Sequence, residues 1–136
     1  MASAGIQGVQ SGLAVDAAYL RERPEVAQRM VDAMVEGLAF SLSPANEQVV
    51  RRVLASRMNL ENAPAAVEAG YRSFVARANR KFQATIPAIE TMQRVMSRAD
   101  RKLLDVKVGD LVDDRFVRQL EESGAAEKLF RDHGVR

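Results

Sequence analysis

The positions of the prolines constrain the fold of this chain more than any other feature. The sequence holds four prolines, Pro24, Pro44, Pro64 and Pro87, and each lies at the start of a stretch with helical apolar spacing. Proline is tolerated in the first turn of a helix, where its missing N–H is not needed, and disrupts a helix further in. The prolines therefore divide most of the chain into successive helices.

The apolar periodicity predicts a mainly α protein of five to six amphipathic helices, none of which is long enough to be stable alone. Leu13-Ala14-Val15 is the exception, because this short apolar run is typical of a strand; we expect at most one short N-terminal strand. The helices are expected from about Pro24 to Ser41, Pro44 to Asn59, Pro64 to Ala78, Thr85 to Met96 and Arg115 to Ser123, with a last turn from Ala126 to Arg131.

Local signals refine these boundaries. The hydroxyl of Ser43 is expected to cap the second helix, and Gly124 is expected to stop the fifth. Gly70 lies inside the third helix, where glycine costs about 1 kcal/mol relative to alanine, so we expect a close helix contact there. Arg98 to Leu111 is predicted to be a longer loop.

The apolar residues of each helix are expected to face a common core. In the first helix they recur every four residues, and in the second they form a valine-rich stripe. Four methionines, in pairs spaced four apart, either fill this core or line an adaptable ligand groove, and we favour the core. The residues concerned are Val26, Met30, Met34 and Leu38; Val49, Val50, Val53 and Leu54; and Met92 with Met96.

Composition excludes several kinds of chemistry. Without cysteine there is no disulfide, thiolate metal site or cysteine nucleophile. The single histidine, His133, is expected in a frayed and exposed tail, so no histidine triad or zinc site is expected. No apolar run is long enough to cross a bilayer, and the chain as written carries no signal peptide, so it would be cytoplasmic.

Two charge patterns are open to a functional interpretation. Asp110, Asp113 and Asp114 could hold a hard cation, but the helix that follows favours an N-cap, and we expect no metal or other cofactor. Residues 51–102 hold eleven Lys or Arg against four acids. Such an excess suits nucleic acid, but it lacks interleaved aromatic residues and is better explained as a solvated surface. No catalytic residues converge, so we do not expect an enzyme.

Two stretches carry a resemblance to a known family. The first is Ala17–Val26 (AAYLRERPEV) together with Val35–Phe40 (VEGLAF), and the second is Leu111–Gly124 (LVDDRFVRQLEESG). In this order they resemble the C-terminal part of the solute-binding proteins of nitrate/sulfonate/taurine-type ABC importers, a family that includes binding proteins for thiamine precursors. The resemblance covers roughly residues 10 to 132.

The resemblance implies a C-terminal piece of a type II periplasmic-binding-protein α/β fold. It implies a non-catalytic solute-binding component for a small anionic or heteroaromatic nutrient, with the solute and an ABC permease as partners. It also implies a periplasmic or membrane-anchored location. Gln10, Ser11 and Gly12 match the segment near the hinge and are the expected ligand-binding residues.

The family has two lobes, and the resemblance implies that this sequence corresponds only to the later part of such a chain. We expect residues 1–12 to be a flexible N-terminal arm and residues 13–136 to be one helical domain. Helices that would have covered the missing lobe then present bare apolar faces, and self-association is the expected remedy. The alternative function is therefore a helical self-associating interaction or scaffold module that has lost solute binding.

Overall fold

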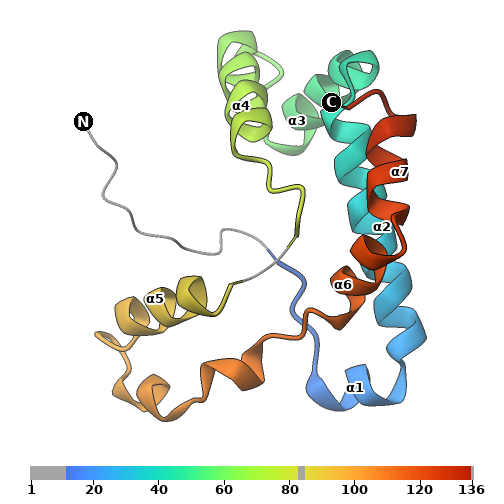
Figure 1. Cartoon of the computed structure of the whole chain (residues 1–136). Coiled ribbons are helices and arrows are strands. Elements are labelled where there is room, and N and C mark those ends of the chain that lie inside the picture. The colour runs from blue at the N-terminus through green and yellow to red at the C-terminus, as the bar shows by residue number, and fades with distance from the viewer. Residues whose placement is uncertain (1–11, 83–84, 136) are drawn as a thin grey trace.

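The protein is mainly helical. The computed structural model describes residues 12–82 and 85–135, and within these ranges every regular element is a helix (Figure 1). Three of these elements are short 3-10 helices: η1 (Pro44–Asn46), η2 (Arg101–Asp105) and η3 (Val108–Leu111). The other seven are α-helices. These are α1 (Ala17–Glu22), α2 (Pro24–Leu42), α3 (Glu47–Arg57), α4 (Pro64–Arg77), α5 (Ile86–Met96), α6 (Arg115–Glu122) and α7 (Ala125–Asp132).

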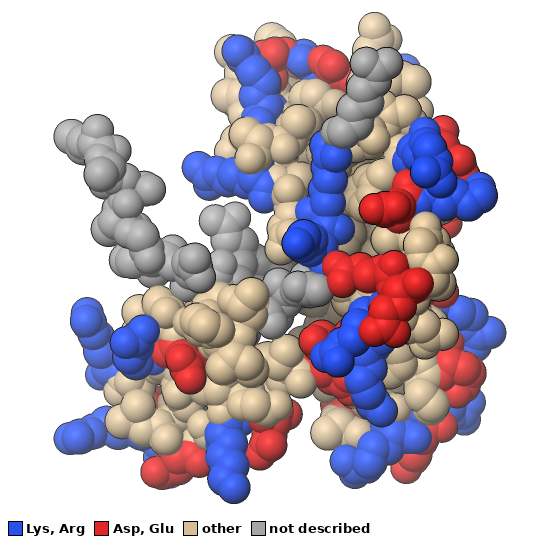
Figure 2. All heavy atoms as spheres, in the orientation of Figure 1, with Lys and Arg blue, Asp and Glu red and all other residues tan. Residues whose placement is uncertain are grey.

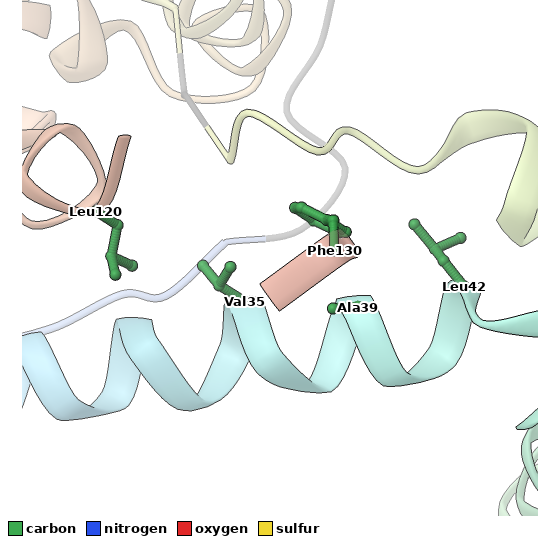
Figure 3. Close-up of a cluster of buried hydrophobic side chains, with 5 residues drawn as sticks. All are labelled: Val35, Ala39, Leu42, Leu120 and Phe130. Atoms are coloured by element: carbon green, nitrogen blue, oxygen red, sulfur yellow. The ribbon is translucent and has the colours of Figure 1, made fainter. Parts of the chain in front are cut away.

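The core lies between α2 and the last two helices, and we call α2, α6 and α7 the bundle. Val35 and Ala39 of α2 are almost completely buried, and Leu120 of α6 and Phe130 of α7 close over them (Figure 3). Leu42 completes this cluster. Burying one such side chain contributes roughly 1.5–3 kcal/mol relative to leaving it exposed, so the bundle is the best-stabilised part of the molecule.

Local sequence signals shape the bundle. Pro24 lies in the first turn of α2, where it costs no hydrogen bond. Gly124, with φ +70°, joins α6 to α7 in the left-handed conformation that glycine adopts without strain. After this turn α7 follows α6 along α2, so that α6 contacts the first half of α2 and α7 the second half.

Helices α3 and α4 pack against each other and join the bundle at the C-terminal end of α2 through η1 (Figure 1). Phe74 and Ala78, from the end of α4 and the residue after it, touch the bundle core. The α5 region is arranged differently, because α5 packs against η2 and η3 and is set apart from the bundle in Figure 1. We call residues 86–111 the α5 lobe.

The predicted mainly α class is confirmed, and Pro24, Pro64 and Pro87 lie in the first turns of α2, α4 and α5. Pro44 begins the 3-10 helix η1, and α3 follows from Glu47. The structure adds detail to the expectations at three places. Leu13-Ala14-Val15 forms no strand, because no second strand is present among the described residues to pair with it. Helix α1 was not expected, although the Asp16 carboxylate caps it by accepting from the N–H groups of Ala18 and Tyr19. The expected loop from Arg98 to Leu111 contains η2 and η3.

The buried face of α2 also differs from the expected one. The helix buries Ala27, Val35, Ala39 and Leu42, whereas Met30 and Met34 each remain 41% exposed. An apolar arc wider than one partner helix can cover leaves its far edge in solvent. Core filling by this methionine pair is therefore wrong.

Two cap predictions change as well. Ser43 is buried at the start of η1, yet its hydroxyl makes no cap hydrogen bond. His133 is not in a frayed tail, since it follows α7, is half-buried and meets the ring of Phe40 edge to face, with 6.2 Å between centroids. Across the described residues, none of the helices combines the length and the apolar character that crossing a bilayer requires.

Candidate interaction surface

The described part of the chain exposes more apolar side chains than it buries. Nine apolar residues are buried, three of them alanines, while fifteen large apolar side chains are more than about a third exposed. Exposed apolar residues scattered singly are ordinary, so their distribution matters more than their number. Six of the fifteen lie in the α5 lobe: Ile86, Val95, Met96, Leu104, Val106 and Leu111.

The side chain of one residue, Gln93, links the elements of the α5 lobe. The side-chain amide nitrogen of Gln93 on α5 donates to the carbonyl oxygens of Leu103 (2.6 Å) and Val106 (2.7 Å), which ties α5 to the returning chain. Ala88 is the one buried residue that the lobe contributes among those described. A single small side chain is too little apolar burial to fix a segment of this length in water.

The charges of the α5 lobe are balanced and unpaired. Five basic and four acidic side chains lie between Ile86 and Leu111, and none of these nine forms an ion pair within the described chain. In Figure 2 the lobe, at the lower left, presents a broad uncharged area, with an acidic side chain within this face and further charged side chains along its lower and left edges. An apolar centre with a charged rim is the usual anatomy of a protein interface.

Outside the lobe, ten charged side chains form ion pairs within the described chain. Arg51 on α3 lies between Glu47, at 2.5 Å, and Glu68 on α4, and its guanidinium carbon lies 5.2 Å from the ring centroid of Tyr71. The hydrogen bond to Glu68 raises the pKa of Arg51, and burial raises the pKa of the Tyr71 hydroxyl. Arg72 also binds Glu68, at 3.1 Å. This cluster joins α3 to α4.

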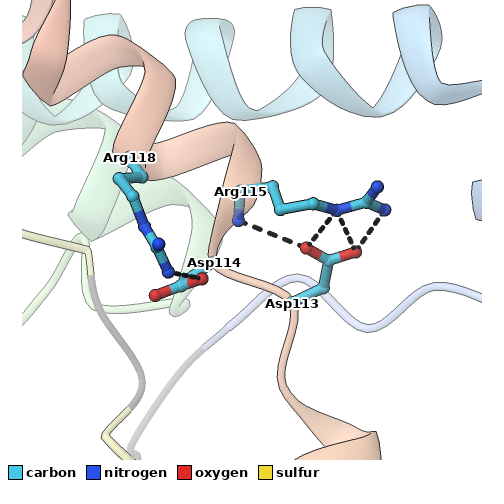
Figure 4. A network of polar contacts seen from close by, with 4 residues as sticks. All are labelled: Asp113, Asp114, Arg115 and Arg118. Atoms are coloured by element: carbon cyan, nitrogen blue, oxygen red, sulfur yellow. Dashed lines mark hydrogen bonds and ion pairs between the residues drawn. The ribbon is translucent and has the colours of Figure 1, made fainter.

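The aspartate pair also forms salt bridges (Figure 4). Asp113 accepts three side-chain hydrogen bonds from Arg115, at 2.9, 3.1 and 2.7 Å, and one from the Arg115 backbone N–H. The side-chain hydrogen bonding lowers the pKa of the Asp113 carboxyl. Asp114 occupies the N-cap position of α6, but its carboxylate binds Arg118 at 2.6 Å instead of a helix N–H. The predicted cap contact therefore comes from Asp113. No group of three metal-ligating side chains is found among the described residues.

The basic stretch of residues 51–102 forms no continuous patch on the face shown in Figure 2, where red and blue side chains alternate. Two of its arginines, Arg51 and Arg72, are paired with Glu68. Arg80 lies with its guanidinium carbon 5.9 Å from the ring centroid of Phe130. This arrangement favours the solvated surface over a nucleic-acid site.

The residues expected to bind a solute are not assembled into a pocket by the described chain. Gln10 and Ser11 lie outside the described residues, and Gly12 is exposed ahead of α1. Two open depressions of about 430 Å³ each lie elsewhere. One is lined by Leu42, Pro44, Arg80, Gly134 and Val135, and the other by Pro24, Glu25, Gln28, Arg29, Phe116 and Gln119.

Sequence reasoning missed the α5 lobe as a surface, since most of it was expected to be core helix and loop. The available signal was the density of apolar residues, Leu103, Leu104, Val106, Val108 and Leu111, in a segment interpreted as a loop. The expected close contact at Gly70 is also wrong, because no atom lies within 4 Å of where its Cβ would be, and the same is true of Gly37.

Comparison of the chain with protein-family models, curated proteins and solved structures gave no match. The resemblance to solute-binding proteins therefore stays a prediction from the sequence. The functional argument rests on the surface of the chain itself.

Proposed function

We propose that this protein is a helical self-associating interaction module, whose folded state is completed by a second copy of the chain. The observation that carries the proposal is the exposed surface. The chain exposes 10368 Å² for a mass of 15.0 kDa. A compact monomer of that mass exposes roughly 7,000 Å².

The excess does not depend on the residues outside the described ranges. Those fourteen residues would contribute roughly 2,200 Å² even with the full surface of an unfolded chain. After this is subtracted, the remaining chain still exceeds its own compact value by roughly 1,700 Å². A stable interface buries about 800 Å² per partner, so the excess is large enough for association.

A second copy suits this surface better than a polyanion or a solute does. The net charge is only +2, and acidic and basic side chains alternate on the face in Figure 2, which opposes tight binding to nucleic acid. The solute-binding function implied by the resemblance stays a prediction, because two of its three residues lie outside the described chain. Self-association needs no feature beyond those described.

The test is the mass of the protein in solution. Sedimentation equilibrium across a range of micromolar concentrations should give a mass that rises to at least twice 15.0 kDa. A mass of 15.0 kDa at every concentration would contradict the proposal. A parallel thermal-shift screen with sulfonates, nitrate and pyrimidine precursors tests the solute-binding prediction, which loses its support if no compound raises the melting temperature.

A further inference from the structure

We infer that the α5 lobe is the association surface, and that it pairs with the α5 lobe of a second copy around a two-fold axis. This inference rests on the self-association proposed above and adds its location and symmetry. The lobe holds six of the fifteen exposed large apolar side chains of the described chain, and Ala88 is its one buried residue. It therefore gains most from being covered.

The charge of the lobe favours its own copy as the occupant. Its five basic residues nearly balance its four acidic ones, so two lobes repel each other little. None of these nine charges forms an ion pair within the described chain, so a second copy can supply partners for them. A second lobe supplies both apolar contacts and opposite charges.

Symmetry supports the same conclusion. Most homo-oligomers are two-fold dimers in which one patch meets its own equivalent. The lobe carries exposed apolar side chains on each of its three helical elements, Val95 on α5, Leu104 on η2 and Leu111 on η3. The face of the lobe drawn in Figure 2 includes a broad area without charged side chains.

The first experiment places a lysine in the lobe. Leu104→Lys and Leu111→Lys alter side chains that are 53% and 60% exposed in the single chain, so each chain should fold as before. A lysine without a partner in a buried apolar interface should raise the dissociation constant at least about tenfold. Met58→Lys is the matched control, because Met58 is 62% exposed but follows α3. It should leave the dissociation constant unchanged.

The second experiment uses the absence of cysteine from the chain. Leu104→Cys introduces the only thiol, and a short bismaleimide should then link two copies, whereas Met58→Cys at the same concentration should give no linked dimer. Circular dichroism of each variant checks that the helices are retained.

The outcomes separate the two proposals. A wild-type chain that is monomeric at every concentration overturns the self-association itself. A wild-type oligomer that both lysine variants of the lobe leave intact, or that is crosslinked through residue 58 and not through residue 104, overturns the assignment to the lobe and leaves self-association standing. Loss of association in the lobe variants alone, with crosslinking through residue 104, supports both.

Discussion

The bundle and the α5 lobe are built from similar residues but reach different degrees of burial. In the bundle, Val35, Ala39 and Phe130 are covered by helices that come from both ends of the described chain, and the nearby aspartates are paired with cations. In the lobe, Val95, Leu104 and others remain exposed, and no charge is paired. The comparison teaches that amphipathic periodicity defines a helix, whereas burial depends on whether another element is available to cover it.

The largest expected difference between the two regions is in their response to side-chain truncation. Phe130→Ala should lower the free energy of unfolding by about 3–5 kcal/mol, because it opens a cavity in the bundle. Leu104→Ala in the lobe should change it by less than about 0.5 kcal/mol in the dissociated chain. Urea denaturation at a concentration where both variants are dissociated measures the two values. Equal losses would remove the distinction between the regions.

A second change should loosen the lobe alone. Gln93→Ala removes the side-chain donor that binds the carbonyls of Leu103 and Val106, at a cost of about 1 kcal/mol. Backbone amides of residues 101–111 should then exchange their hydrogens roughly fivefold faster, whereas those of α2 should not change. Gln48→Ala on α3, an exposed glutamine with no such bonds, is the control. Faster exchange in α2 would show that the lobe is coupled to the bundle.

A third change should stabilise the bundle and so widen the difference in stability between the bundle and the α5 lobe. Gly37→Ala on α2 adds a Cβ where no atom lies within 4 Å, and alanine stabilises a helix by roughly 0.5–1 kcal/mol relative to glycine. Urea denaturation should show this gain. Gly124→Ala is the contrasting variant, because its positive φ strains any other residue, and it should lower stability. A loss at Gly37 would indicate that another molecule occupies that space.

The smallest expected effect is at the junction between the two regions, where Asp113 binds Arg115. Because the pKa of Asp113 is lowered in the folded chain, the unfolded chain takes up the proton first, so this stabilisation is present above the ordinary aspartate pKa of about 3.9 and is lost as the pH falls through the folded value. For an exposed pair it amounts to less than about 1 kcal/mol. Asp113→Asn should remove it at pH 7 and flatten the acid limb of the stability curve.

Arg115→Gln provides the check on that last prediction. It removes the donor instead of the acceptor, so it should give a similar loss at neutral pH, and the double variant should lose no more than either single one. Additive losses would show that the two side chains act independently.

Much of the fold could be predicted from the sequence because its signals are local. Pro24, Pro64 and Pro87 start helices through the geometry of their own rings, and Gly124 ends one through its positive φ. The side of α2 that is buried could not be predicted, because the apolar arc includes Met30 and Met34 as well as Val35, and the contacts with α6 and α7 choose between them.

The location of the candidate surface was harder to predict from the sequence than the positions of the helices. Self-association was expected from a general argument about uncovered apolar faces, but its location was not. The exposure of Leu104 and Leu111 depends on how η2 and η3 return along α5, which the bonds of Gln93 determine. Those bonds join residues at spacings that neither helical nor strand periodicity anticipates.

The bundle joins the two ends of the described chain, and this has a consequence for synthesis on the ribosome. The side-chain amide of Gln28 donates to the backbone carbonyl of Phe116, 88 residues further on, and α2 meets its partner helices only at the end of the sequence. Helices α3 and α4, in contrast, follow each other closely and can pair while later codons are being translated. Val35 and Ala39 therefore stay uncovered by α6 and α7 until these two helices have emerged, and apolar surface of α2 is exposed during that interval.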